Sequence, residues 1–457
     1  MQVAQGSTLL HFSRNGAYQP GAAELLVLER GEGPYVFDTA GRRYVDALSS
    51  LFCAQIGYSY GTEMARAARE QLERLAFNNL WGTAHPRALE LGENLADLAP
   101  EGFGKVFFTS GGSESVEAAW KIARQYHLAN GDQRRRKAIA RDIAYHGVTL
   151  GALSLTGVER FKEPFGPPAI ETRHVSNTNA FRSELSGVGL TRALLEELEQ
   201  AVLEEGPETI AMIIAEPVQN AGGCLEPPPG YWAGLREVAD RYGILLVADE
   251  VITGCGRLGQ WFGVTRFGAT PDLITIAKGL TSAYAPMGAV LVANRVAQPL
   301  YEDKRTLLHG ITFAGHPLSA AIALKNIEIF ARDGVLENVR AQESGLAERL
   351  ESLRELPIVG DVRGAGFFWA VELVKDEKGG RFDADERERL LREFMPARLL
   401  EARLIARVDD RGDAVLQIAP PLISTDAVLD EIVDAMRAVL EDAGRFMGVE
   451  SAVAASR

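Results

Sequence analysis

Short apolar segments alternate with helical patterns through the middle of the chain, and this alternation constrains the fold more than any other feature. Each apolar segment is continuous, which is typical of strands that are buried on both faces of a parallel sheet. A helical pattern over residues 114–129 follows the first of them. The apolar segments lie at residues 105–110, 209–217, 244–250, 272–279 and 287–294. The middle of the chain is therefore predicted to form an α/β unit with a mostly parallel sheet sandwiched by helices.

The two ends of the chain show a different pattern. Residues 31–50 read as short strands joined by a turn, and residues 362–374 and 414–422 read as one strand each. A final helix is predicted to begin at Asp426. Strands and helices that follow one another in this way indicate a smaller α+β domain built jointly by both termini.

These patterns predict how the chain divides into domains. We expect an N-terminal segment and part of the small domain over residues 1–60, a large domain over 61–325, and the rest of the small domain over 326–457. Residues 156–190 and 296–312 are predicted to be long loops, and loops of that length in a compact enzyme are often functional.

Charge and cysteine content exclude several classes of function. The formal net charge of −14 at pH 7 argues against nucleic acid or an anionic membrane as the partner. No Cys and His spacing typical of a zinc site is present, so no metal is expected. The start of the chain lacks the pattern of a signal peptide, and no apolar run reaches the roughly 20 residues of a membrane helix. A reduced, cytoplasmic setting is expected, without a disulfide framework among Cys53, Cys224 and Cys255.

Charged residues stand at the ends of two predicted strands. Asp249 and Glu250 end the strand at 244–250, and Lys278 ends the strand at 272–279. Ligands of open α/β sheets bind beyond the carboxyl ends of the strands, so an acid and a lysine placed there can face one bound molecule. A structural ion pair is the simpler interpretation of these residues taken alone.

A glycine-rich turn precedes the first predicted helix. It contains Ser110, Gly111, Gly112 and Ser113, where glycine lets the backbone approach a ligand and the helix start favours a phosphate group. A plain helix cap explains the same residues. Tyr145 follows another predicted strand, where it could stack on a flat ring or be a buried structural tyrosine.

Two other signals are rejected. Residues 254–259 match the GxGxxG pattern of dinucleotide sites, but the Gly-rich residues that follow make a poor helix. Neither a GxxxxGK[ST] phosphate loop nor the GxSxG elbow of a serine hydrolase occurs in the sequence.

Taken together, the order and spacing of these motifs resemble the class III (subgroup II) aminotransferases among the fold-type I pyridoxal-phosphate enzymes, with the ω-amine and β-alanine:pyruvate transaminases nearest. The resemblance covers nearly the whole chain. Its most specific part is Asp-Glu-Val at 249–251, a Gly-rich arm and then Lys-Gly at 278–279. The other matching stretches are residues 107–124, 144–157, 215–223, 285–293, 311–321 and 362–373.

This resemblance implies pyridoxal 5′-phosphate as the cofactor. Lys278 matches the lysine that binds it through a Schiff base and later moves a proton on the substrate, and Asp249 matches the acid that pairs with the pyridine nitrogen. Thr312 matches a threonine that reaches the phosphate of a neighbouring subunit, which implies a homodimer with active sites at the interface. Further cofactor contacts are expected from Ser110, Gly111, Gly112, Ser113, Tyr145, His146, Glu216 and Val251. Whether dimers pair into tetramers is left open.

The resemblance also implies a substrate pocket. Arg407 matches the mobile arginine that pairs with an acceptor carboxylate, and Arg411 is its rival because the local spacing is imperfect. Phe52, Trp81 and Tyr145 match positions in the wall of the pocket. Ile252 stands where several ornithine and 4-aminobutyrate transaminases carry glutamine, and Cys255 replaces the usual aromatic without an evident effect.

The resemblance implies a transaminase that moves an amino group from an ω-amine, β-amino acid or diamine donor to a keto acid, with pyruvate expected. An aminomutase or epimerase of the same fold and a non-catalytic cofactor-binding protein are the alternatives. A mutase or epimerase would convert its substrate without net amino transfer. A non-catalytic relative is disfavoured because Asp249 and Lys278 are both present.

Overall fold

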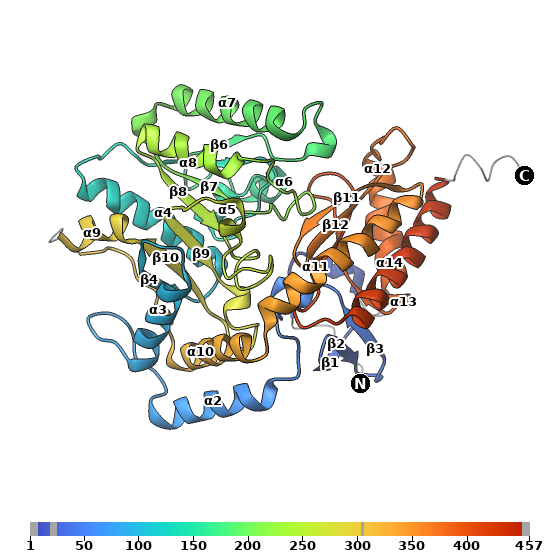
Figure 1. The fold of residues 1–457 in the computed structure, drawn as a ribbon, viewed down its shortest axis with the longest axis horizontal. Coiled ribbons are helices and arrows are strands. Elements are labelled where there is room, and N and C mark those ends of the chain that lie inside the picture. Colours follow the sequence, from blue (N-terminus) through green and yellow to red (C-terminus); the bar gives the residue numbers. More distant parts are fainter. Residues whose placement is uncertain (1–7, 19–24, 303–305, 450–457) are drawn as a thin grey trace, which may run out of the picture.

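The computed structural model describes residues 8–18, 25–302 and 306–449. Its main feature is a seven-stranded sheet in the order β4-β10-β9-β8-β7-β5-β6 (Figure 1). The strands of this sheet are β4 (Phe103–Thr109), β5 (Lys137–Arg141), β6 (Thr172–Val175), β7 (Ile210–Ala215), β8 (Leu245–Asp249), β9 (Leu273–Ile276) and β10 (Gly288–Ala293). The prediction of a mostly parallel sheet is confirmed, because β6, β5, β7, β8 and β9 pair in parallel and only β10 runs against its neighbours β9 and β4.

This strand arrangement places the ends of distant segments along one edge. Because β10 is antiparallel to both β4 and β9, these two strands point the same way. The carboxyl ends of β4, β5, β7, β8 and β9 therefore meet at a single edge of the sheet. Residues that follow these strands lie close together even where they are far apart in the sequence.

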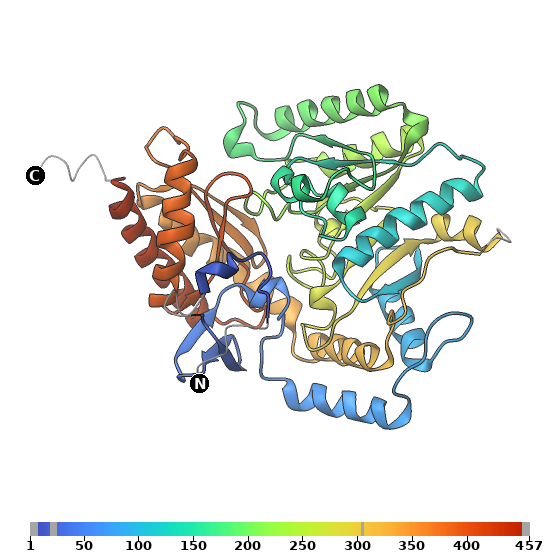
Figure 2. The same cartoon turned by 180° about the vertical axis from the view of Figure 1, so that it is seen from behind.

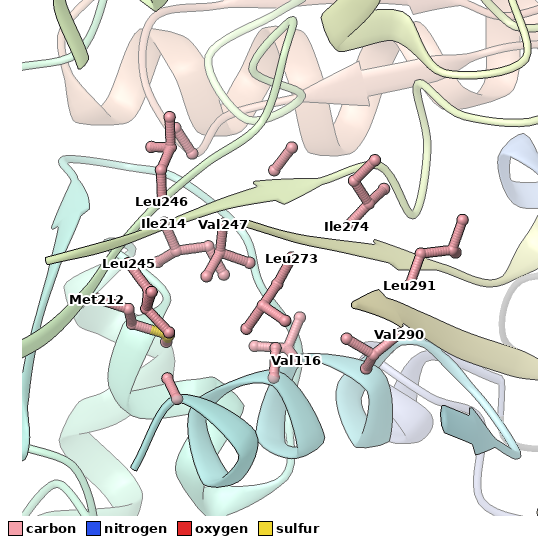
Figure 3. Packing of buried hydrophobic residues seen from close by; sticks show 14 of the residues in the cluster. Val116, Met212, Ile214, Leu245, Leu246, Val247, Leu273, Ile274, Val290 and Leu291 are labelled. Atoms are coloured by element: carbon pink, nitrogen blue, oxygen red, sulfur yellow. The ribbon is translucent and has the colours of Figure 1, made fainter. Parts of the chain in front are cut away.

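Helices cover the sheet and complete its core. Helix α4 (Gly112–Ala129) buries Val116, Ala119 and Ala123, which recur at helical spacing on one face. Figure 3 shows Val116 of α4 close to Leu273 and Val290 of the strands above it. The other helices around this sheet are α2 (Gly61–Arg74), α3 (Pro86–Leu98), α5 (Leu150–Leu155), α6 (Glu159–Lys162), α7 (Gly187–Glu205), α8 (Tyr231–Tyr242), α9 (Asn294–Glu302) and α10 (Pro317–Arg332).

Two four-stranded sheets and their helices form a second unit, which contains residues from both ends of the chain. One sheet has the order β1-β2-β3-β13 and the other β11-β12-β15-β14. Val45 on β3 (Arg43–Asp46) pairs in parallel with Leu404 on β13 (Leu404–Ile405), and both views show the blue N-terminal strands beside the red C-terminal helices (Figures 1 and 2). The predicted small α+β unit from both termini is confirmed. The remaining elements are β1 (Leu28–Glu32), β2 (Tyr35–Asp38), β11 (Val359–Ala365), β12 (Phe368–Leu373), β14 (Arg407–Asp409), β15 (Val415–Ile418), α11 (Val335–Glu351), α12 (Ala384–Arg387), η8 (Glu388–Phe394), α13 (Met395–Glu401) and α14 (Asp426–Met447).

Two local predictions are wrong. The single strand expected at 362–374 is a hairpin, β11 and β12, which turns at Gly366 with a φ of 56°. A Cβ atom on Gly366 would lie 2.5 Å from the carbonyl oxygen of Arg257, so only glycine fits this turn. The loop expected at 296–312 begins as helix α9, whose pattern is interrupted by Pro299.

The remaining local predictions have mixed outcomes. The stretch 156–190, also expected to be a loop, contains α6, strand β6 and the start of α7. The final helix does begin at Asp426, as predicted. The domain boundaries at 60/61 and 325/326 stay predictions. Parts of the predicted end segments, 1–7, 19–24 and 450–457, lie outside the described residues, as do 303–305 of the predicted loop.

In the described part of the chain, no helix has both the length and the apolar character that a membrane crossing requires. Cys53, Cys224 and Cys255 are all free thiols in the structure.

Candidate active site

A cavity of about 140 Å³ opens at the edge where the carboxyl ends of the central strands meet. Residues that follow β4, β5, β7, β8 and β9 contribute to its walls. Its lining residues are Gly112, Ser113, Tyr145, His146, Gly147, Glu216, Asp249, Val251, Ile252, Thr253 and Lys278. The structure thus brings together the acid, the lysine and the glycine-rich turn that the sequence placed at separate strand ends.

Lys278 follows β9 and offers its amine to this cavity. Its backbone has a φ of 41°, a left-handed conformation that non-glycine residues rarely adopt and that often occurs at functional sites. Burial lowers the pKa of the amine, although the nearby Cys53, Asp249 and Glu216 act in the opposite direction. Among the described residues, no hydrogen bond or ion pair involves the amine, so Lys278 is not committed to a structural role.

Asp249 is the last residue of β8 and is held by three contacts. Its Oδ1 atom accepts hydrogen bonds from the Thr275 hydroxyl and the Val251 N–H, both at 3.1 Å. Its Oδ2 atom lies 2.7 Å from Nδ1 of His146, and both side chains are buried. Because a carboxylate accepts, Nδ1 of His146 carries the proton in this contact. These contacts fix the orientation of the carboxylate before any ligand binds.

His146 and Glu216 extend this buried polar network. The backbone N–H of His146 donates to the Thr156 hydroxyl at 2.9 Å. The Nε2 atom of the His146 ring is buried without a partner among the described residues. Glu216 accepts from the N–H groups of Tyr145 at 3.3 Å and Asn220 at 3.0 Å. Burial raises the pKa of Glu216.

The start of α4 offers backbone donors to the same cavity. Helix α4 begins at Gly112, and the preceding Gly111 provides no side chain to cap it. A Cβ atom on Gly112 would lie 2.8 Å from Cγ1 of Val251, so glycine lets the helix start approach the cavity closely. The N–H groups of a first helical turn have no partner within the helix, and they suit an anionic group together with the positive end of the helix dipole. The Ser113 hydroxyl lies at the same position, where it accepts from the Val148 N–H at 3.1 Å.

These features fit pyridoxal 5′-phosphate. The phosphate would lie against the start of α4 and Ser113, the aldehyde carbon would face the Lys278 amine, and the pyridine nitrogen would face Asp249. Tyr145 and Val251 both line the cavity and are available to the faces of the ring.

A larger cavity of about 900 Å³ shares Tyr145, Ile252 and Lys278 with the first. Phe52 is buried in its wall, with its ring centroid 5.9 Å from the Lys278 amine and 5.8 Å from the ring of Phe368. Arg407, on β14, lies with its guanidinium 6.0 Å from the Phe52 ring. The larger cavity therefore leads from the lysine to a candidate carboxylate-binding arginine.

The two rival arginines have different environments. Arg411 is buried and forms an ion pair with Asp409, with 2.8 Å between its Nε and Oδ1 of Asp409. The guanidinium of Arg407 makes no hydrogen bond or ion pair with any residue that the structure describes. Burial and the neighbouring Arg411 lower the pKa of Arg407 to about 10. Arg407 is thus the arginine whose guanidinium is available to a ligand.

Trp81 and Thr312 are not brought to the site of their own chain. Trp81 is 65% exposed and lies beside Gly310, and Thr312 is exposed two residues further on. Neither is among the described residues that line the two cavities. A role for these residues in the site of a neighbouring subunit stays a prediction.

The structure also clarifies residues 254–259. They form turns and no helix begins there, which agrees with the prediction that they are not a dinucleotide site. Cys255 is buried, and a Cβ atom on Gly279 would lie 2.9 Å from the Cβ atom of Cys255. Cys255 therefore packs behind the residue that follows Lys278.

Most of the outer wall of the larger cavity is not evident from the sequence. Its lining includes Leu51, the aromatic Phe161 and a group of charged residues at the mouth. The Phe161 ring meets the Tyr145 ring edge-on at 6.5 Å. The charged residues at the mouth are Arg14, Arg160, Glu388, Arg392 and Asp410. None of them follows a strand of the main sheet, so no strand-end signal could have revealed them.

Comparison with known proteins gives consistent results. The family model described as "Aminotransferase class-III" matches residues 17–440. A probable aminotransferase of Mycobacterium tuberculosis is 47% identical over 441 residues, which cover 95% of this chain and 93% of that protein. The putrescine–pyruvate aminotransferase of Pseudomonas aeruginosa is 37% identical, over 91% of this chain and 90% of that protein. The crystal structure of an omega transaminase from Pseudomonas jessenii in complex with PMP has a TM-score of 0.91 and 34% identity, covering 97% of this chain and 98% of that one.

Proposed function

This chain belongs to the class-III aminotransferases and is a transaminase, and we propose that it moves the amino group of an ω-amine, β-amino acid or diamine to pyruvate with pyridoxal 5′-phosphate bound through Lys278. Class-III aminotransferases depend on this cofactor, and the similar omega transaminase binds PMP. The similarity to a putrescine–pyruvate aminotransferase supports pyruvate as the acceptor.

One observation supports the proposal more than the others. The amine of Lys278, the carboxylate of Asp249 and the uncapped start of α4 all line one cavity. When bound there, pyridoxal 5′-phosphate supplies an electron sink for the carbanion that forms when the substrate loses a proton from carbon. The chain itself must bind the phosphate and keep the ring nitrogen protonated. It must also move the proton that leaves the substrate carbon.

Lys278 and Asp249 are proposed to have separate roles, in proton transfer and in charge stabilisation. Because burial lowers the pKa of Lys278, its Nζ atom is more readily neutral, and a neutral amine can take the proton from the substrate carbon and return it. The Asp249 carboxylate stabilises positive charge at the ring nitrogen in a site shielded from water. His146, 2.7 Å from Asp249, keeps that carboxylate oriented by donating its Nδ1 proton.

Arg407 is proposed to bind the carboxylate of the keto acid. Its guanidinium has no described partner, and it faces the wall formed by Phe52. A planar guanidinium can form two parallel hydrogen bonds with a carboxylate. A donor that lacks a carboxylate would instead lie against the apolar Phe52 ring, which lets one cavity accept both substrates in turn.

The active enzyme is proposed to be a homodimer. Phe77 and Phe313 meet with ring centroids 5.7 Å apart and are 40% and 62% exposed. Trp81, which lies beside Gly310, is exposed as well. Exposed aromatic clusters of this kind are typical of protein interfaces. Thr312 precedes Phe313, so a partner subunit that binds this aromatic cluster would also lie against Thr312. Thr312 is proposed to contact the active site of that partner subunit.

A donor screen tests the proposed function. Amines, diamines and β-amino acids are each offered with pyruvate or 2-oxoglutarate, and the products are separated by chromatography. Formation of alanine together with the aldehyde or ketone of the donor is expected. Conversion of a donor to an isomer without alanine would indicate an aminomutase or epimerase, and no conversion of any donor would indicate a non-catalytic protein.

A further inference from the structure

Two arginines share one carboxylate at the mouth of the larger cavity. Arg160 lies on α6, Arg392 lies in the π-helix η8, and Asp410 lies in the turn between β14 and β15. Arg160 contacts both oxygens of Asp410, with 3.1 Å between its Nη1 and Oδ2. Arg392 contacts Oδ2 through Nε at 3.1 Å and Nη2 at 2.5 Å. All three residues line the same cavity as Lys278 and Arg407.

The charges at this mouth do not balance. Each of the other two acids in the cavity wall already has an arginine, because Glu388 pairs with Arg14 and Asp409 pairs with Arg411. The carboxylate of Asp410 is therefore shared by the guanidinium groups of both Arg160 and Arg392. Both arginine side chains are 45% exposed, whereas the Asp410 side chain is only 18% exposed. The carboxylate is thus enclosed by cations that can themselves reach solvent and ligands.

We propose that Asp410 occupies the position of a second substrate carboxylate and thereby restricts this transaminase to keto acids with one carboxylate. This inference rests on the proposed function and adds to it the class of acceptor. Arg407 binds the first carboxylate inside the cavity. A second, distal carboxylate that extends toward the mouth meets two guanidinium groups that are already paired with Asp410, so it would have to displace that carboxylate to gain a cationic partner.

The inference assigns Asp410 a role in specificity rather than in chemistry. A keto acid with one carboxylate needs only Arg407 and leaves the mouth undisturbed. Removal of the Asp410 charge would free two arginine forks for a dicarboxylate, since paired guanidinium groups bind carboxylates strongly. The isosteric Asp410→Asn substitution keeps the shape of the turn and removes only the charge.

Asp413 provides a matched control. It lies three residues further along and is also contacted by two arginines, Arg182 at 3.2 Å and Arg381 at 2.8 Å. It lines a separate groove with Asp142 and Glu197, and it is not among the described residues around the substrate cavity. Asp413→Asn therefore removes a carboxylate that two arginines share outside the cavity, although Arg182 keeps Glu372 as a second partner.

The test compares the binding of glutarate, an unreactive dicarboxylate, with that of butyrate by titration calorimetry on the purified holoenzyme. The wild type is expected to bind glutarate no more than threefold tighter than butyrate. Asp410→Asn is expected to bind glutarate at least tenfold tighter than the wild type does, with butyrate binding unchanged. Asp413→Asn should resemble the wild type, and adding Arg392→Gln to Asp410→Asn should abolish the gain. If Asp410→Asn fails to fold, Asp410→Ser removes the same charge.

Kinetics give a second reading of the same variants. The ratio of kcat/KM for 2-oxoglutarate to that for pyruvate should rise at least tenfold in Asp410→Asn. An unchanged ratio together with unchanged glutarate binding would overturn the inference, as would a wild type that already prefers glutarate tenfold. Absence of amino transfer with every donor would refute the proposed function instead. The effect of Asp410→Asn on glutarate binding would still test the proposed role of Asp410.

Discussion

Asp409 holds Arg411 in a buried ion pair in which Nε of Arg411 lies 2.8 Å from Oδ1 and 3.0 Å from Oδ2 of the carboxylate. Burial alone would raise the pKa of Asp409, but the charge of Arg411 outweighs it and holds the pKa at about 2. Arg411 therefore has a structural role. The guanidinium of Arg407, four residues earlier, has no described hydrogen-bond or ion-pair partner. The two arginines should therefore respond differently to substitution.

Replacement of Arg407 by alanine should impair the use of pyruvate much more than the use of a simple amine. Hydrogen bonds to a charged group contribute about 1.5–3 kcal/mol, which corresponds to a loss of about 10- to 100-fold in kcat/KM for pyruvate. The half-reaction with an amine donor that has no carboxylate should change little. Rapid-mixing measurements of the two half-reactions check this, and equal losses in both would remove Arg407 from the carboxylate site.

Replacement of Arg411 by alanine should instead destabilise the protein. It leaves the Asp409 carboxylate buried without its charged partner, which typically costs about 3–5 kcal/mol. Urea unfolding followed by circular dichroism measures the change in the free energy of unfolding. The double variant Asp409→Asn with Arg411→Met serves as the control and should lose less, because it leaves no buried charge.

Replacement of Lys278 by alanine should abolish turnover. The loss of a positioned proton-transfer group alone lowers the rate by about 10²- to 10⁴-fold, and covalent attachment of the cofactor is lost as well. Steady-state assays and borohydride reduction followed by peptide mass spectrometry measure both effects. Lys378→Ala, at an exposed surface position, is the control. Near wild-type turnover in Lys278→Ala would refute the mechanism.

Replacement of Asp249 by asparagine should slow the reaction while cofactor binding persists. The uncharged amide cannot stabilise a cationic ring nitrogen, and the loss of one such electrostatic contact lowers kcat by about 10²- to 10³-fold. The contacts with Thr275 and Val251 involve Oδ1, so an amide oxygen at that position can retain them. Absorbance titration with cofactor and single-turnover rates separate binding from reaction, and an unchanged rate would mean that another group fulfils this role.

The lowered pKa of Lys278 predicts a pH dependence that can be measured without any cofactor. Only a neutral amine reacts with an acylating reagent, and burial lowers the pKa of this amine, so Lys278 should become reactive at a lower pH than an ordinary lysine. Labelling of cofactor-free protein over a pH series, followed by peptide mass spectrometry, gives the midpoint for each lysine. The midpoint of Lys278 should lie below that of the exposed Lys378, and coincident midpoints would contradict the shift.

The amino-acid sequence was sufficient to predict the central architecture and the residues at the strand ends. Continuous apolar segments separated by helical patterns identify a parallel sheet, and carboxyl ends of parallel strands share one edge. Asp249, Lys278 and the turn at Gly112 are therefore expected in one place from the sequence. The spacing of these motifs also indicates the family, because each motif consists of residues that are close together along the chain.

Contacts between distant segments determine which arginine is available to a ligand and which residues surround the mouth of the cavity. Arg407 and Arg411 look equivalent in the sequence, and their difference depends on the direction in which each side chain points and on the partner that each one meets. Arg160, Arg392 and Asp410 come from segments up to 250 residues apart, which no local pattern connects. Periodicity reports on contacts within an element, whereas charge pairing between elements arises only when packing brings them together.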